Sequence, residues 1–117
     1  MKKILVVDDE ENIRMLYQEE LQEEGYEVTA ASNGNEALDV LSKAGPFDLV
    51  TLDIRMPGMD GINTVRAIKE KYQGLAVVLV TAYGEYKQDF STWASDAYIV
   101  KSADLTELKA TIKRIIG

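Results

Sequence analysis

Five short aliphatic runs alternate with longer amphipathic segments, and this alternation constrains the fold more than any other feature of the sequence. The runs are residues 4–7, 28–31, 49–52, 77–80 and, more weakly, 97–100. The first, third and fourth runs are almost continuously apolar, which is typical of strands covered on both faces in a parallel sheet. The sequence therefore predicts five strands.

The segments around these strands predict five helices, because apolar residues recur in them at helical spacing with polar residues between. In chain order the apolar positions are Ile13, Leu16, Tyr17 and Leu21; Ala37, Leu38 and Leu41; Ile62, Val65, Ile68 and Tyr72; Tyr86, Phe90, Trp93 and Ala94; and Leu105, Leu108, Ile112 and Ile115. The fourth set has the poorest pattern. The first three helices are expected to end before Gly25, Gly45 and Gly74, and Asp104 is expected to cap the fifth, with Glu107 three residues on.

Five strands alternating with five helices are typical of a doubly wound α/β sheet in which all strands run parallel. At 117 residues the chain is expected to be a single domain, residues 1–117, with no output domain. The carboxyl ends of parallel strands share one edge, and such sheets bind their ligands at that edge. Function is therefore expected there.

Charged and hydroxyl side chains follow four of the five predicted strands. Asp8 and Asp9 follow the first, Asp53 the third, Thr81 the fourth and Lys101 the fifth. Taken singly, each has a structural explanation: the acidic pair can cap a helix, and Asp53 can form a turn with its own backbone. A parallel sheet nevertheless brings all five residues to one edge, where caps and turns do not require this mixture of groups. Their convergence favours a functional site.

The chain contains no Cys and no His, which excludes thiolate and imidazole groups as nucleophiles or metal ligands. Three carboxylates within ~4 to 6 Å repel one another by a few kcal/mol per pair at an effective dielectric constant near 20, so a cation must offset their charge. Oxygen ligands favour Mg²⁺ or Ca²⁺, and an incomplete protein cage suits Mg²⁺. The sequence therefore predicts a magnesium site.

The same residues can support phosphoryl transfer. An aspartate such as Asp53 can act as a nucleophile on phosphorus when the charge on the transferred group is neutralised. Mg²⁺ and Lys101 can provide that neutralisation, and the Thr81 hydroxyl can donate a hydrogen bond to a phosphoryl oxygen.

The net charge of −7 argues against direct binding of nucleic acid, which requires a basic surface. The longest weakly polar run, residues 75–83, is well short of the ~20 residues that span a bilayer. We therefore expect no membrane insertion and a cytoplasmic location.

Four separated motifs carry a family resemblance. They are Val-Val-Asp-Asp-Glu at residues 6–10, Leu-Asp-Ile-Arg-Met-Pro-Gly-Met-Asp-Gly at 52–61, Val-Thr-Ala-Tyr-Gly at 80–84 and Asp-Ala-Tyr-Ile-Val-Lys at 96–101. In this order and spacing the chain resembles, over its whole length, the receiver domains of two-component response regulators. The resemblance implies a CheY-like, flavodoxin-like fold with strand order 2-1-3-4-5.

The resemblance also implies roles for individual residues. Asp53 would accept a phosphoryl group from a histidine kinase or a histidine phosphotransfer protein. Asp9, the Asp53 carboxylate and the backbone carbonyl of Arg55 would ligate Mg²⁺, with Asp8 acting largely through water. The chain would not be a turnover enzyme, although it could dephosphorylate itself.

A conformational switch is implied as well. Thr81 would move toward the phosphoryl group and Tyr98 would swing inward behind it, as a population shift between two states. The fourth helix, fifth strand and fifth helix would then present a changed surface to a downstream effector protein. We expect a monomer or weak dimer.

One departure from the family pattern keeps an alternative open. The family usually has Lys-Pro with a cis peptide bond, whereas this chain has Lys101 followed by Ser102. An interaction module with impaired phosphorylation therefore remains a second interpretation, and a fragment of a larger regulator a third. A magnesium-dependent phosphatase is disfavoured because the chain has no spare length for a substrate-covering element. Nucleotide binding is disfavoured because no glycine-rich phosphate loop follows the first strand.

Overall fold

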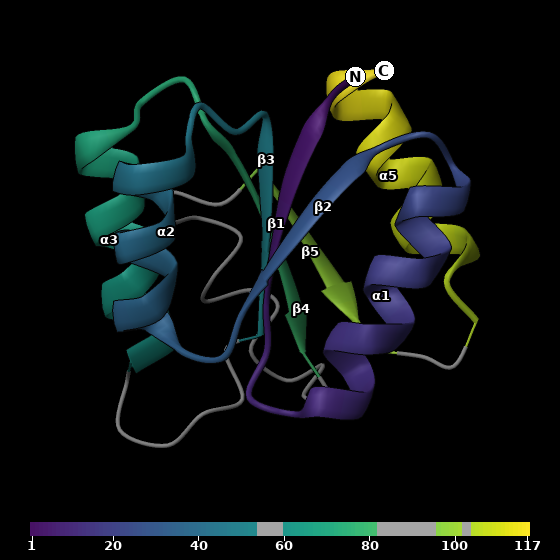
Figure 1. Cartoon of the computed structure of the whole chain (residues 1–117), viewed down its shortest axis with the longest axis horizontal. Coiled ribbons are helices and arrows are strands. Elements are labelled where there is room, and N and C mark those ends of the chain that lie inside the picture. The colour runs from purple at the N-terminus through teal and green to yellow at the C-terminus, as the bar shows by residue number, and fades with distance from the viewer. Residues whose placement is uncertain (54–59, 82–95, 102–103) are drawn as a thin grey trace.

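The computed structural model describes residues 1–53, 60–81, 96–101 and 104–117 of the chain (Figure 1). The strands are β1 (Lys3–Val7), β2 (Glu27–Ala31), β3 (Leu49–Leu52), β4 (Ala76–Thr81) and β5 (Ala97–Val100). The helices are α1 (Glu11–Glu23), α2 (Gly34–Ala44), α3 (Asp60–Lys71) and α5 (Thr106–Ile116). The predicted fourth helix falls in residues 82–95, outside the described residues.

The five strands form one parallel sheet in the order β2-β1-β3-β4-β5, which confirms the predicted topology. β3 and β5 have the predicted bounds, and the other three strands extend one residue beyond prediction at one or both ends. All residues of β3 and β4 are buried, as the apolar runs indicated. The strand order reverses between β1 and β3, which places the expected binding crevice beside these two strands.

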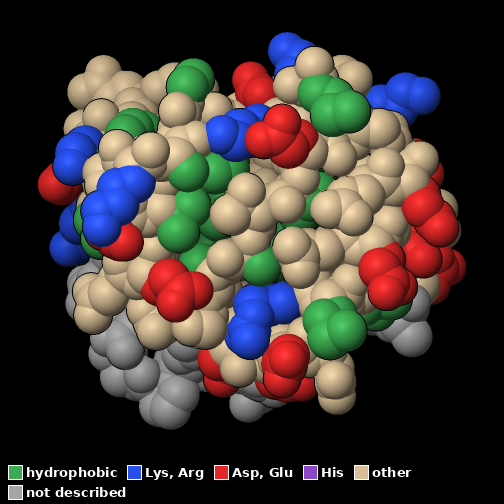
Figure 2. Space-filling model, viewed as in Figure 1, with side chains coloured by type: hydrophobic (Ala, Val, Ile, Leu, Met, Phe, Trp, Pro, Cys, Tyr) green, Lys and Arg blue, Asp and Glu red, His purple; other side chains and the backbone are tan. Residues whose placement is uncertain are grey.

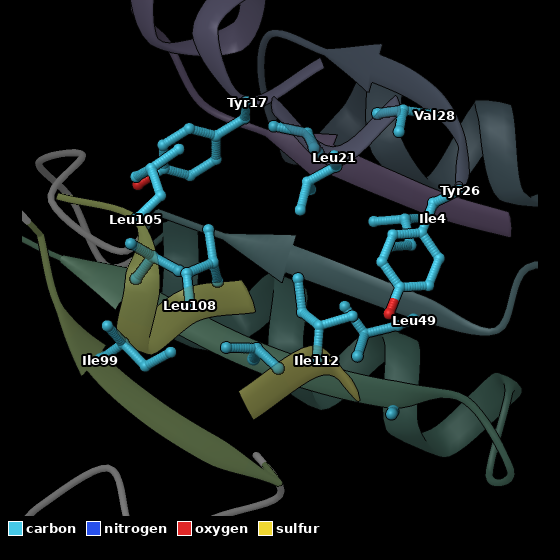
Figure 3. Packing of buried hydrophobic residues seen from close by; sticks show 14 residues of the cluster. Ile4, Tyr17, Leu21, Tyr26, Val28, Leu49, Ile99, Leu105, Leu108 and Ile112 are labelled. Atoms are coloured by element: carbon cyan, nitrogen blue, oxygen red, sulfur yellow. The ribbon is translucent and has the colours of Figure 1, made fainter. Parts of the chain in front are cut away.

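Helices cover both faces of the sheet. Figure 1 shows α1 and α5 on one side and α2 and α3 on the other. Side chains alternate between the faces of a strand, so each face has its own hydrophobic cluster. On the α1 and α5 side, Tyr17 and Leu21 from α1 pack with Leu108 and Ile112 from α5 over the sheet (Figure 3). On the other face, Leu41 from α2 and Ile68 from α3 pack over buried strand residues such as Leu5.

Local sequence signals explain the start of α2 and the end of α1. The Asn33 side chain accepts a hydrogen bond from the Glu36 N–H at 2.8 Å and caps α2. Gly25 has a φ of 98°, the left-handed conformation that ends many helices and that glycine adopts without strain. The predicted cap of the last helix is corrected: α5 begins at Thr106, and the Asp104 carboxylate accepts from the Thr106 N–H at 2.9 Å instead of capping a helix that starts beside it.

Charge is distributed unevenly over the surface. Acidic side chains gather over the side formed by α1 in Figure 2, where Glu11, Glu19, Glu23 and Glu24 are exposed. Among the described residues, no helix is long and apolar enough to cross a membrane.

Candidate phosphorylation site at the carboxyl edge of the sheet

Backbone hydrogen bonds to neighbouring strands hold three of the predicted site residues in place. The Asp8 N–H donates to the Ala31 carbonyl at 3.1 Å, and the Asp53 N–H donates to the Val7 carbonyl at 3.0 Å. The Lys101 N–H donates to the Thr81 carbonyl at 2.5 Å. Each residue thus continues the hydrogen-bond ladder one step beyond its strand, so the sheet itself fixes the relative positions of their backbones.

Lys101 joins two of the acids directly. Its ammonium donates to Asp8 Oδ2 at 2.8 Å and to Asp53 Oδ2 at 3.0 Å. The Lys101 side chain is 13 % exposed, and those of Asp8 and Asp53 are 3 % and 1 % exposed. Charge-assisted bonds in such a shielded position are stronger than surface ion pairs, so one cation holds two buried carboxylates together.

Burial and pairing act in opposite directions on the ionisation of this cluster. Burial raises the pKa of Asp8, with the nearby Asp53 charge adding to the effect, although hydrogen bonds from Lys101 and the Glu10 N–H oppose it. Burial lowers the pKa of Lys101, but its hydrogen bonds and attraction to Asp8 and Asp53 outweigh burial, and the net pKa is raised. The ammonium therefore stays charged, whereas the buried Asp8 carboxylate still favours a further positive charge beside it.

An acidic cluster lies at the mouth of the site. Asp8, Asp9 and Glu10 each offer a carboxylate oxygen, and these oxygens lie within 4.8 Å of one another; Asp8 is buried and the other two are exposed. This donor set is entirely oxygen and carries several negative charges, which fits a hard divalent cation such as Mg²⁺. Glu10 was not among the predicted ligands, although it directly follows the acidic pair in the sequence.

The two predicted switch residues occupy different environments. Thr81 ends β4 and is completely buried, one strand away from Asp53. Tyr98 lies opposite Leu79 in the β4–β5 pairing and is partly buried against the cluster on the α2 and α3 face. Arg55, the predicted backbone ligand, and Ser102, which departs from the family pattern, lie outside the described residues.

Sequence reasoning missed two residues of α1 that lie near the site. The Arg14 guanidinium donates to the Asp8 carbonyl at 2.7 Å, which fixes the acidic loop to the first turn of α1. Tyr17 is 3 % exposed, and burial raises its pKa to about 12, with Lys101 lowering it and Asp8 and Asp53 raising it further. Helical periodicity assigned Tyr17 to the core, which is correct, but it could not show that the phenol lies within electrostatic reach of the site.

The alternative explanation of Asp8 as a helix cap is not confirmed, although its carboxylate does have a local structural role. Its Oδ1 accepts from the Glu10 N–H at 2.8 Å, which is a local turn, while Oδ2 accepts from Lys101. Glu10, which directly precedes α1, provides no side-chain cap. One carboxylate thus shapes the loop and contributes to the site.

The arrangement of acids, lysine and threonine at this edge can be compared with known families. The model of the response regulator receiver domain matches residues 4–113 of the chain. The chain is a response regulator receiver domain. As a member of this family it is a phospho-accepting component of two-component signalling, and the family is not an enzyme family in itself.

Solved receiver structures agree with the fold. The response regulator TrrA of Thermotoga maritima, in complex with Mg²⁺-BeF, is 51 % identical, with a TM-score of 0.90 over 98 % of this chain and 99 % of that one. The same regulator in complex with the histidine kinase ThkA is 50 % identical, with a TM-score of 0.88 over 100 % of both chains.

Curated relatives show the domain in two settings. Sporulation initiation phosphotransferase F of Bacillus subtilis is 38 % identical over 98 % of this chain and 94 % of its own length. Six longer relatives, including the transcriptional regulatory protein ResD of the same species, are spanned over only 24 % to 48 % of their length. A receiver domain of this size therefore makes up nearly all of some relatives and a minor part of others.

Proposed function

We propose that Asp53 is the residue of this receiver domain that accepts the phosphoryl group. The observation that supports it most is the Lys101 ammonium, which contacts the buried carboxylates of Asp8 and Asp53 at 2.8 and 3.0 Å. A purely structural aspartate at a strand end does not require a second acid and a shared lysine beside it. A phosphoryl acceptor does, because its negative charge must be balanced before and after transfer.

In the proposed step, a carboxylate oxygen of Asp53 attacks the phosphorus of a partner's phosphohistidine. The new O–P bond forms as the N–P bond breaks, and the leaving imidazole takes up a proton. Lys101 is already in contact with the Asp53 carboxylate, so its ammonium can follow the developing charge on the phosphoryl oxygens without a large rearrangement. The Thr81 hydroxyl then donates to one phosphoryl oxygen.

Asp9, Asp53 and the Arg55 carbonyl would hold Mg²⁺, with Asp8 acting largely through water. The exposed Asp9 and buried Asp8 border the same acidic cluster, and TrrA, which is 51 % identical, is known in complex with Mg²⁺-BeF. When bound, Mg²⁺ supplies positive charge that neutralises the acids and the transferred group. Glu10 lies in the same cluster and would hold a water of the ion.

Phosphorylation would be read out through Thr81 and Tyr98. Thr81 and Tyr98 lie on neighbouring strands, and β5 is one of the two edge strands of the described sheet, so movement of Tyr98 can change the surface there. We propose that a downstream effector binds the surface formed by the fourth helix, β5 and α5. The fourth helix belongs to residues outside the described part of the chain.

The proposed phosphoryl donor is a histidine kinase or a histidine phosphotransfer protein, and the chain would act in the cytoplasm. This donor is supported by the complex of TrrA with a histidine kinase. The phosphorylated chain would return to its resting state by hydrolysis at the same site, and it would act as a monomer or weak dimer.

The test is incubation of the chain with Mg²⁺ and acetyl phosphate, followed by intact mass spectrometry. The proposal predicts one added phosphoryl group in the parent chain and none in Asp53→Asn. Asp39→Asn is the matched control, because Asp39 is an exposed aspartate of α2 far from the site. This control is expected to accept phosphate as the parent does.

Two outcomes would contradict the proposal. An added group that persists in Asp53→Asn would place the acceptor elsewhere. No addition to the parent, with Mg²⁺ and acetyl phosphate in excess, would instead support the interaction module with impaired phosphorylation.

A further inference from the structure

An ion pair attaches the amino end of β5 to the rest of the sheet. None of the residue roles implied by the family resemblance involves this pair. Asp96 directly precedes β5, and its N–H donates to the Val77 carbonyl at 2.7 Å. Its carboxylate Oδ2 accepts from the Val77 N–H at 2.8 Å. Asp96 therefore pairs with both backbone polar groups of Val77, which lies in β4.

Lys69 completes this attachment from α3. Its ammonium donates to the same Asp96 Oδ2 at 3.0 Å and to the Leu75 carbonyl at 2.9 Å, just before β4 begins. The Lys69 side chain is 20 % exposed and that of Asp96 is 40 % exposed. Unlike a pair of freely exposed side chains, these two groups are each also bonded to backbone, so their geometry is fixed. We call Asp96 and Lys69 the β5 anchor.

β5 is a short strand at one edge of the sheet. It contains four residues, lies at the end of the sheet, and pairs with β4 through Val78↔Ala97 to Thr81↔Val100. Side chains alternate along a strand, so a slip of one residue would turn each one to the opposite face. Such a slip would move Tyr98 out of its cluster and carry Lys101 away from Asp53.

We propose that Asp96 and Lys69 are positioning residues for phosphoryl transfer: the β5 anchor sets the register of β5 and thereby places Lys101 on Asp53. The proposal rests on the function proposed above for Asp53 and Lys101. The β5 anchor lies at the opposite end of the strand from the site, about 16 Å away at ~3.3 Å per residue, so it acts on the reaction through the backbone of the strand and not by contact. It ties β5 to α3 and β4.

The test uses the whole chain with three variants of the β5 anchor. Asp96→Ala removes the carboxylate, Asp96→Asn keeps an oxygen that can accept from the Val77 N–H, and Lys69→Met removes the ammonium. The matched controls are Asp39→Ala and Lys43→Met, which break a 3.0 Å ion pair between exposed side chains of α2. The measured quantities are the rate of phosphorylation by acetyl phosphate at saturating Mg²⁺, and the Kd for Mg²⁺.

Asp96→Ala is expected to slow phosphorylation by about tenfold or more, because displacing a reacting group by about 1 Å can cost ~100-fold. Asp96→Asn and Lys69→Met are expected to fall between this variant and the parent. The Kd for Mg²⁺ should not rise, since Asp8 and Asp9 follow β1, which is separated from β5 by β3 and β4, and displacement of Lys101 leaves the negative charge of the acids less balanced. Both control variants should behave as the parent.

A folded Asp96→Ala variant that is phosphorylated at the parent rate would overturn the proposal. So would an equal loss of rate and Mg²⁺ affinity, because that indicates general loss of structure instead of misplaced Lys101. Amide hydrogen exchange separates this proposal from the assignment of Asp53. Faster exchange at residues 97–101 in Asp96→Ala is expected even if the parent accepts no phosphate, and unchanged exchange there would refute the role of the β5 anchor.

Discussion

Replacement of Lys101 by methionine should destabilise the chain far more than replacement of an ordinary lysine. Lys101→Met removes the contacts at 2.8 and 3.0 Å and leaves two carboxylates that are 3 % and 1 % exposed without their shared cation. Removing one partner of a buried ion pair costs about 3 to 5 kcal/mol, because the remaining charge is neither solvated nor balanced. We expect a loss of this size in the free energy of unfolding at pH 7 without Mg²⁺.

Lys109 provides the matched control. Its ammonium contacts Glu20 at 2.6 Å, but the two side chains are 26 % and 33 % exposed, so water can solvate the glutamate once the lysine is gone. Lys109→Met is therefore expected to cost far less stability than Lys101→Met. Urea denaturation followed by far-UV circular dichroism measures both values on the same scale.

Added Mg²⁺ should recover part of the stability lost in Lys101→Met, since a bound divalent cation again balances the acids. Lys109→Met should gain no more from Mg²⁺ than the parent. The reasoning would be refuted if Lys101→Met were no less stable than Lys109→Met in the absence of the ion.

Two further predictions concern α1 and α2. Because burial raises the Tyr17 pKa to about 12 from 10.0, the unfolded chain releases the phenol proton first, and stability should fall between pH 10 and 12. At ~1.4 kcal/mol per pKa unit the loss is about 3 kcal/mol, and Tyr17→Phe should remove this part of the pH profile; a parallel decline in both proteins would contradict the expectation. In Gly34→Ala the new methyl group would overlap the buried Thr64 hydroxyl, so a loss of about 1 to 3 kcal/mol is expected in thermal or urea unfolding. Thr64→Ala should cost less in the Gly34→Ala background than alone, and additive losses would argue against the overlap.

The fold could be predicted from the sequence because its inner strands are buried on both faces and its helices on one. Residues 77–80 are entirely aliphatic and residues 49–52 contain a single polar residue, the buried Thr51, and the structure places both runs in inner strands of the sheet. The start of α5 was less predictable. An aspartate such as Asp104 can accept a backbone hydrogen bond either as a helix cap or in a turn. Here its carboxylate accepts from the N–H of Thr106, two residues further along the chain.

The site was predictable for a related reason: parallel strands bring their carboxyl ends together whatever their sequence separation. Lys101 and Asp8 are 93 residues apart and nevertheless form an ion pair. Contacts between side chains of different elements follow no such rule. Neither the Arg14 bond to the Asp8 carbonyl nor the pairing of Lys69 with Asp96 has a sequence signal, because each depends on how one helix packs against the sheet.

The most direct measurement is a crystal structure of the chain with Mg²⁺ and beryllofluoride, the combination bound to TrrA. The account predicts a beryllofluoride adduct on Asp53, with the Lys101 ammonium and the Thr81 hydroxyl within hydrogen-bonding distance of its fluorine atoms and Mg²⁺ beside Asp9. An adduct on another residue, or a Lys101 side chain directed away from Asp53, would contradict it.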